Sequence, residues 1–194
     1  MSAPEVAAGA TGVGLGRLSA EVIEIAAFRE RTPELEELAA ARGVRLAGLG
    51  RINAGSARLT LAVRPGRWLL LGPPAAPGAS LRAWQQALAG RGAAVDLSAG
   101  LAALLLGGRD VREMLARGCR LDLHPAAFPA GSAAATIMAQ VPVVLAVLTS
   151  RILLLTPATT ARHLTEWLVS TARPFGLASR AETAVHELFG VEST

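Results

Sequence analysis

The sequence contains no lysine, no tyrosine and a single cysteine, Cys119. One cysteine excludes an internal disulfide and is typical of a reducing compartment, so we expect a cytoplasmic protein. Aromatic residues make up only 4% of the chain, which is too few for a surface that stacks nucleic-acid bases. The start of the sequence has no basic stretch followed by an apolar core, so we expect no signal peptide.

The basic character of the chain comes from arginine alone. The 19 arginines raise the isoelectric point to about 11.1, although the net charge is only +4, because no group titrates between histidine and arginine. The arginines stand singly along the sequence and form no stripe that could follow a phosphate backbone. The sequence therefore predicts no nucleic-acid partner.

One long stretch, residues 123–150, has no Asp, Glu, Lys or Arg and is long enough to span a bilayer. Pro125, Pro129, Gly131 and Pro142 would interrupt a membrane-spanning helix within its own length. The apolar part of the stretch is also rich in valine, which favours strands. We therefore expect buried β-structure here and no membrane segment.

The apolar pattern indicates an alternation of strands and helices. Hydrophobic residues make up 52% of the sequence, which is enough for a large core and suggests a further surface buried against a partner. Helices are predicted after Thr32 and Ser80 as N-caps, and over 109–117 and 160–173. Strands are predicted over 20–28, 57–63, 68–71, 95–98, 101–106, 133–148 and 152–156, with Pro142 at an edge or bulge.

These elements repeat in the order β-α-β-β-α over residues 20–98 and again over 101–173. The predicted fold class is α/β (α+β), with two ferredoxin-like halves that share a core. We expect residues 1–18 to be a flexible leader, 19–175 the folded domain, and 176–194 an amphipathic tail. Ser179 and Glu182 have the spacing of a helical capping box, so a short helix is predicted to end near Phe189.

Few side chains in the sequence could perform chemistry. His124, His163, His186 and Cys119 lie far apart, with no metal-ligand spacing between them. A nucleophilic site of Cys119, His124 and Asp122 is conceivable, but we favour a structural corner in which Asp122 binds backbone N–H groups.

Two glycine-rich stretches were considered as phosphate-binding loops. Gly12, Gly14 and Gly16 follow no predicted strand and so lack the context of a dinucleotide-binding loop. Residues 107–109 (Gly-Gly-Arg) at a strand-to-helix junction could hold an anion, and close packing of the backbone explains these glycines equally well. The sequence therefore predicts no catalytic, cofactor-binding or metal-binding residue in this chain.

Residues 118–128 read GCRLDLHPAAF and resemble the Gly-Cys-x-x-Asp-Leu-His-Pro-x-x-Phe signature of the gamma subunit of heterotetrameric sarcosine oxidase. Supporting segments bring the resemblance to about residues 57–172. They are RWLL at 67–70, MAQVPV at 138–143, and LLLTP at 153–157 ahead of a helix with Glu166-Trp167-Leu168. The sequence departs from the pattern at Arg120, where proline is common, and at Ala133 and Ala135, which replace Cys and Gln.

The resemblance implies a non-catalytic subunit of a cytoplasmic oxidase that demethylates sarcosine to glycine and passes the one-carbon unit to tetrahydrofolate. It implies partner subunits alpha, beta and delta, and FAD, FMN, NAD and tetrahydrofolate bound by the complex but not by this chain. The fold is expected to be similar to the folate-binding domain of the glycine-cleavage aminomethyltransferase. Two alternatives remain open: a free-standing folate-binding or aminomethyltransferase-like protein, and the small subunit of a related N-methylamino-acid dehydrogenase.

Overall fold

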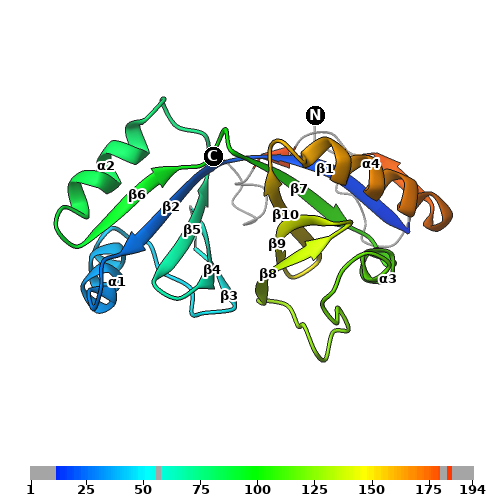
Figure 1. Cartoon of the computed structure of the whole chain (residues 1–194), viewed down its shortest axis with the longest axis horizontal. Helices are drawn as coiled ribbons and strands as arrows, with labels where there is room; N and C mark the ends of the chain where they lie inside the picture. The colour runs from blue at the N-terminus through cyan, green and yellow to red at the C-terminus, as the bar shows by residue number, and fades with distance from the viewer. Residues whose placement is uncertain (1–11, 56–57, 180–182, 185–194) are drawn as a thin grey trace, which may run out of the picture.

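The first half of the chain forms a five-stranded sheet with two helices on its outer face. The computed structural model describes residues 12–55, 58–179 and 183–184 (Figure 1). The strand order is β3-β4-β5-β2-β6. The elements are β2 (Glu21–Ala27), α1 (Thr32–Ala41), β3 (Arg51–Ala54), β4 (Leu59–Arg64), β5 (Arg67–Gly72), α2 (Ala79–Ala87) and β6 (Gly92–Asp96). Without β3, this arrangement is a ferredoxin-like unit.

The second half repeats the plan and incorporates a strand from the start of the chain. The order of its seven-stranded sheet is β11-β1-β7-β10-β9-β8, and β12 also pairs with β1. The elements are β1 (Val13–Ser19), β7 (Leu101–Gly107), α3 (Val111–Ala116), β8 (Ala133–Met138), β9 (Val141–Val147), β10 (Arg151–Pro157), α4 (Ala161–Ala172), a 3-10 turn η1 (Arg173–Phe175), β11 (Leu177–Ser179) and β12 (Thr183–Ala184). The predicted fold class, with two ferredoxin-like halves, is confirmed.

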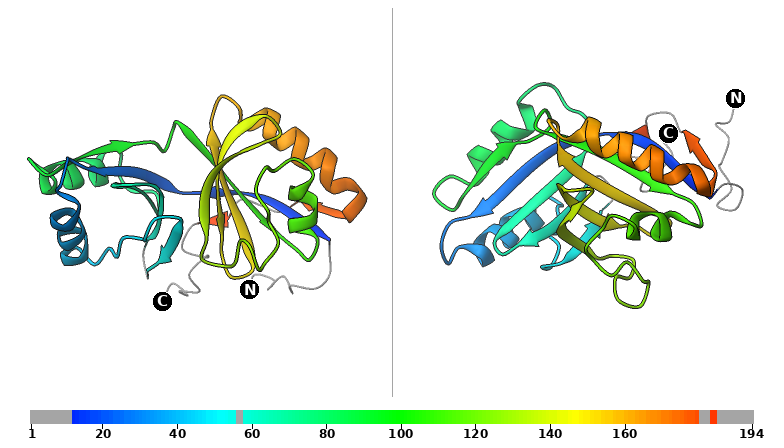
Figure 2. Two further views of the ribbon diagram at one scale, coloured as in Figure 1. Left: turned by 60° about the horizontal axis from the view of Figure 1, so that its bottom comes forward. Right: turned by 45° about the vertical axis from the view of Figure 1, so that its right-hand side comes forward.

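Two long strand pairs join the halves. β1 continues into β2 after Ala20, and β6 continues into β7 through residues 97–100. β1 pairs antiparallel with β7, and β2 pairs antiparallel with β6, so one ribbon runs through both sheets. Helices α1 and α2 lie at one end of the molecule, and α3 and α4 lie at the other (Figures 1 and 2).

The core has three layers, because both faces of each sheet are covered. In β10, Ile152 and Leu154 pack toward α3 and α4, while Leu153 and Leu155 pack between the two sheets. This alternation follows from the two-residue repeat of a strand. It explains why the strand reads as a continuous apolar run. A third cluster, which includes the fully buried Leu35, lies under α1 and α2.

The structure corrects the predicted leader and domain limits. Residues 13–18, predicted to be flexible, form most of β1, which lies inside the seven-stranded sheet between β7 and β11. Val13 and Leu18 are buried there. The small residues Gly14 and Gly16 concealed this strand from the apolar pattern. Residues 1–11 lie outside the described residues.

The predicted single strand over 133–148 is a hairpin. Ala139 and Gln140 have φ values of 48° and 67°, which form the turn between β8 and β9. An Ala-Gln pair carries none of the usual turn signals, so the sequence did not reveal it. The pairing of β9 with β10 begins at Val144, so Pro142 lies outside it. The missing N–H of Pro142 therefore breaks no hydrogen bond between β9 and β10.

The structure differs from three further predictions about helix starts and the C-terminal helix. α1 begins at Thr32 with Arg31 as its N-cap, and α2 begins at Ala79 with Gly78 as its N-cap, so Thr32 and Ser80 are not caps. Ser179 lies in β11, and β12 follows at 183–184, so these residues are not helical as predicted. The rest of the predicted tail helix lies outside the described residues. Within the described ranges, no helix has the length and apolarity needed to cross a membrane.

Candidate functional site

The corner at residues 118–128 follows α3 and is held by hydrogen bonds to its own backbone. The Asp122 carboxylate (Oδ1) accepts a hydrogen bond from the backbone N–H of His124 at 2.8 Å. The His124 ring atom Nδ1 accepts one from the backbone N–H of Ala126 at 3.2 Å. The backbone N–H of Phe128 donates to the His124 carbonyl at 2.8 Å. These side chains therefore shape a turn, as the sequence predicted.

An arginine of α3 ties this corner to the fold. Nη1 of Arg112 donates to the carbonyl of Leu123 at 2.6 Å and to that of Phe128 at 2.9 Å. Charge-assisted hydrogen bonds of this kind are about twice as strong as neutral ones. Arg112 carries no local sequence signal for this role, because an arginine on a short helix normally points to solvent.

The corner packs against the β8–β9 turn and α4. Leu123 is buried in the core beneath α3 and α4. Gly118 accepts a hydrogen bond from the backbone N–H of Ala139 at 3.1 Å. A Cβ at Gly118 would overlap the ring of Trp167, so the indole rests directly on this glycine. The corner thus connects three elements of the second half.

The structure does not assemble the nucleophilic site that was considered for Cys119. The cysteine forms a β-bridge with Met138, while Asp122 and His124 are exposed and bound to local backbone. Among the residues that the structure describes, no hydrogen bond joins Cys119 to His124. A thiol needs an adjacent base to become an activated nucleophile, and this geometry does not supply one.

The remaining histidines show no metal-binding arrangement in the described part of the chain. His163 Nε2 lies 3.1 Å from the Ala139 carbonyl, and Glu166 instead binds Arg162 at 2.8 Å. No group of three His, Cys, Asp or Glu residues converges among the described residues. His186 lies outside them.

The glycine segments do not form a phosphate-binding loop. Gly14 and Gly16 lie within β1 itself, where there is no turn to surround a phosphate. After Gly107 and Gly108, helix α3 has only six residues, and its N-cap is Asp110. The Asp110 carboxylate binds Arg109 at 3.1 Å, and this hydrogen bond raises the pKa of Arg109. A carboxylate at this helix start disfavours a second anion.

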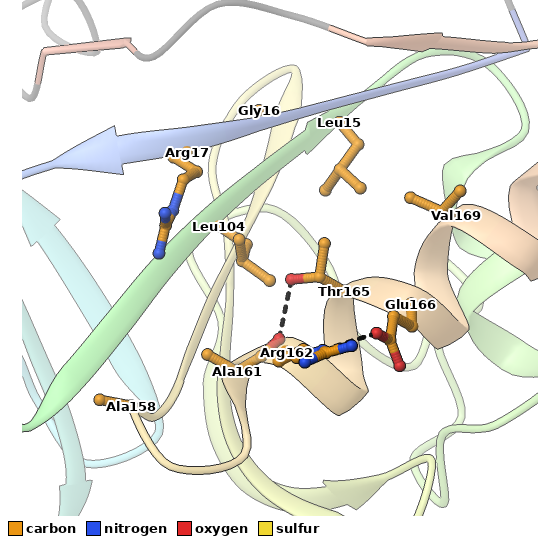
Figure 3. Close-up of a pocket in the computed structure, with 10 residues that line it drawn as sticks. All are labelled: Leu15, Gly16, Arg17, Leu104, Ala158, Ala161, Arg162, Thr165, Glu166 and Val169. Atoms are coloured by element: carbon orange, nitrogen blue, oxygen red, sulfur yellow. Dashed lines mark hydrogen bonds and ion pairs between the residues drawn. The ribbon is translucent and has the colours of Figure 1, made fainter.

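A hollow lies between β1, β7 and the start of α4 (Figure 3). Its volume is about 590 Å³. Leu15, Leu104 and Val169 line its apolar side, and Arg17, Arg162 and Glu166 supply the charges. We call it the α4 groove. Its size falls in the range of small-molecule sites.

Three of the polar side chains in the α4 groove, all on α4, are bound within that helix. Thr165 Oγ1 donates to the carbonyl of Ala161 at 2.8 Å. Arg162 binds Glu166 at 2.8 Å, and this hydrogen bond raises the pKa of the Arg162 guanidinium. Neither Thr165 nor Glu166 is placed as a nucleophile with a base beside it. The groove provides shape and charge.

Comparisons with known proteins give one consistent family. A sequence profile described as sarcosine oxidase, gamma subunit family matches residues 38–169. Among solved structures, the chain is similar to the heterotetrameric sarcosine oxidase from Corynebacterium sp. U-96 in complex with pyrrole 2-carboxylate. The identity is 30% and the TM-score 0.75, covering 87% of this chain and 88% of that chain. No curated protein matches by sequence.

A second similarity concerns the fold alone. The chain is similar to the glycine cleavage system aminomethyltransferase T from Bartonella henselae, with 15% identity and a TM-score of 0.64. The match covers 90% of this chain and 48% of that chain. The predicted likeness to the glycine-cleavage aminomethyltransferase fold is confirmed. At this identity it says nothing about activity.

Proposed function

Because this chain belongs to the sarcosine oxidase gamma subunit family, we propose that it serves as a non-catalytic subunit of a heterotetrameric sarcosine oxidase. The observation that supports this proposal most directly is the 30% identity to a chain of such an oxidase, over 87% of this sequence. The expected reaction of the complex is oxidative demethylation of sarcosine to glycine, with the one-carbon unit passed to tetrahydrofolate. We place this complex in the cytoplasm, in line with the single cysteine.

The proposed role is to supply shape, because the polar side chains of the corner and the Arg162–Glu166 pair of the α4 groove are bound to backbone or to each other. Asp122, His124 and Arg112 hold a corner, and Arg162 holds Glu166. FAD, FMN, NAD and tetrahydrofolate would then be bound by the alpha, beta and delta subunits. The reacting groups would also reside on those companions.

Assembly tests this proposal. The full-length tagged chain is co-expressed with the alpha, beta and delta subunits of the proposed oxidase and purified through the tag. We expect all four chains to elute together in equal amounts, with a flavin absorbance that the chain alone does not show. An active, fully assembled oxidase that forms without this chain would overturn the proposal.

The alternative is a free-standing folate-binding protein that shares only its fold with the aminomethyltransferase. Calorimetric titration of the isolated chain with tetrahydrofolate separates the two. Saturable binding at about micromolar levels, near −8 kcal/mol, would favour the alternative. The absence of heat, together with co-elution of the companions, favours the subunit. A related N-methylamino-acid dehydrogenase would differ in the substrate that the assembled complex consumes.

A further inference from the structure

The connection between α3 and β8 projects from the second half of the molecule. It leaves the body after α3 and returns at the start of β8, and its tip lies beyond the neighbouring strands and helices (Figures 1 and 2). We call residues 123–132 the apolar loop, because their sequence LHPAAFPAGS contains no Asp, Glu, Lys or Arg. The exposed residues of the apolar loop are His124, Pro125, Ala126, Ala127, Pro129 and Ala130.

Burial within this chain does not explain why the apolar loop lacks charge. The uncharged stretch 123–150, predicted to be buried β-structure, is so only in part, since β8 and β9 account for residues 133–147. The residues ahead of β8 are mostly exposed. Charged side chains are common on exposed loops, because water solvates them there. A segment that is exposed in the single chain and lacks them has the composition of the centre of a protein interface.

The apolar loop is held in one conformation by the rest of the chain. The two hydrogen bonds from Arg112 described above hold its first part. The backbone N–H of Gly131 donates to the carbonyl of Val147 at 2.8 Å and holds its last part. Pro125 and Pro129 restrict the backbone between these points. A segment that is already ordered loses little conformational entropy when it binds, which favours association.

The backbone donors at the tip of the apolar loop are satisfied within the loop itself. The N–H groups of residues 126–128 all donate to His124, at 2.8–3.2 Å. A buried N–H group without a partner is costly, so another surface can cover this tip without that cost. The carbonyls of Ala126 and Ala127 accept no hydrogen bond from any residue in the described ranges. They are therefore available to donors of a partner.

The shape and charge of the apolar loop indicate what can cover it. A single short segment would cover only one flank of a projecting loop, so the loop fits a concave surface. The α4 groove of a second copy is concave, but Arg17, Arg162 and Glu166 line it, and an uncharged loop would offer these charges no partner. Such a contact between unlike surfaces would also continue from copy to copy into a ring or filament. An apolar hollow on a different chain satisfies both shape and charge.

We propose that the apolar loop inserts into a concave, apolar surface of a companion oxidase subunit. This inference rests on the proposed function, which supplies the companions, and it names the part of this chain that one of them holds. The tip enters that surface, and N–H or hydroxyl groups of the companion donate to the carbonyls of Ala126 and Ala127. The hydrogen bonds of Asp122 and His124 then serve assembly, because they keep the tip in the shape that the companion receives.

Charged substitutions at the tip test the proposal in the co-expressed complex. Ala126→Glu and Ala126→Arg place opposite charges at the same exposed position. An apolar surface should reject both, so the affinity of the chain for its companions should fall about 100-fold in each variant. Retention of the companions on the tagged chain over a dilution series measures this affinity.

A loop of similar composition provides the matched control. Residues 73–77 (PPAAP) join β5 to α2 and are exposed, but Arg58 and Arg82 lie against the glycines on either side of them. Ala75→Glu and Ala75→Arg therefore place the same charges on a loop whose surroundings are already charged. Both control variants should assemble as the unchanged chain does, and every variant should keep the melting temperature of the unchanged chain.

Cysteine labelling gives a second readout that does not depend on weakening the complex. In a Cys119→Ser background, Ala127→Cys introduces a single thiol at the exposed tip. Its reaction with a thiol reagent should slow about tenfold or more on assembly, because a covered thiol is shielded from the reagent. Ala75→Cys in the same background should react equally in both states.

The outcomes distinguish this proposal from the proposed function. If the unchanged chain retains no companions, the proposed function fails. If it retains them while both Ala126 variants assemble normally and Ala127→Cys stays reactive, the loop proposal fails alone. Loss of retention with only one of the two charges would also overturn the loop proposal, because the receiving surface would be charged.

The isolated chain separates the other possible covers of the loop. The thiol of Ala127→Cys should react freely there at every protein concentration. Shielding that does not depend on concentration would overturn the proposal, because this chain's own residues would cover the loop. Shielding that grows with concentration would overturn it in favour of a second copy.

Discussion

Ser98 lies where the chain passes from the five-stranded sheet to the seven-stranded sheet, and it binds residues on both sides of that junction. Its hydroxyl oxygen accepts a hydrogen bond from the backbone N–H of Val22 at 2.9 Å. Its backbone N–H donates to Asp96 Oδ1, also at 2.9 Å. The side-chain and backbone hydrogen bonds from Ser98 lower the pKa of Asp96 below its ordinary value. One serine thus links the strands that hold the two halves together.

We expect Ser98→Ala to raise the pKa of Asp96 toward its ordinary value, because the largest cause of the shift is removed. The loss of a partner for the Val22 N–H should lower the free energy of unfolding by about 1–3 kcal/mol. A lowered folded-state pKa stabilises the fold at neutral pH, and this stabilisation disappears as the pH falls through that pKa. The part of the stability difference between Ser98→Ala and the unchanged chain that is due to Asp96 should therefore vanish in acid.

Carboxyl NMR titration and urea unfolding at neutral and acid pH measure these effects. Ser170→Ala is the matched control, because Ser170 is an exposed serine of α4. An unchanged Asp96 titration in Ser98→Ala would show that Ser98 does not stabilise the carboxylate.

Helix α3 and helix α4 meet at a glycine whose role is packing. Gly118 directly follows the C-cap of α3, which is Arg117 with φ of −65°. Gly118 is not among the residues with positive φ. Its lack of a side chain matters because Trp167 of α4 lies against it. The Arg117 guanidinium in turn lies 4.4 Å from the centre of the Phe175 ring, beyond the end of α4.

Gly118→Ala should lower the free energy of unfolding by about 1–3 kcal/mol, because its Cβ would overlap the indole of Trp167. Trp167→Leu in the same chain should recover part of this loss, and a double-mutant cycle by chemical unfolding measures the coupling. Gly100→Ala is the control, since its Cβ would approach nothing closer than 3.6 Å. Additive effects of Gly118→Ala and Trp167→Leu would contradict the contact.

At the scale of the whole molecule, the two halves cannot be separated at the middle of the sequence. β1 comes from the start of the chain but lies in the sheet of the second half, between β7 and β11. Its Leu18 packs in the inter-sheet core with Leu105 and Leu153. The first strand therefore supplies a central element to a half that follows much later in the sequence, as the pairing of Leu15 with Leu106 shows.

Deleting residues 1–19 should prevent the chain from folding, because it removes β1 and exposes the backbone edge of β7 inside the core. Soluble yield and circular dichroism of the truncated chain measure this. Arg17→Ala, an exposed position of the same strand, should fold normally. A soluble, cooperatively folded truncation would mean that β1 is dispensable, as a flexible leader would be.

The amino-acid pattern alone determined the class of fold and the family. Periodic apolar residues predicted α4 and β10 within a few residues, and the GCRLDLHPAAF segment pointed to the gamma subunit. The role of Asp122 as a local backbone acceptor was also predictable, because a hydrogen bond spanning two residues depends on local sequence. These features depend on neighbours along the chain, so no tertiary contact was needed to predict them.

Tertiary structure decided what depends on residues far apart in sequence. β1 is a strand because β7 and β11 provide hydrogen-bond partners on both sides of its small residues. Arg112 is an anchor because the corner brings two carbonyls to it. The preference of a residue for helix or strand depends on a few neighbours along the chain. The energies of strand pairing and side-chain packing depend on residues that folding brings close from elsewhere in the sequence.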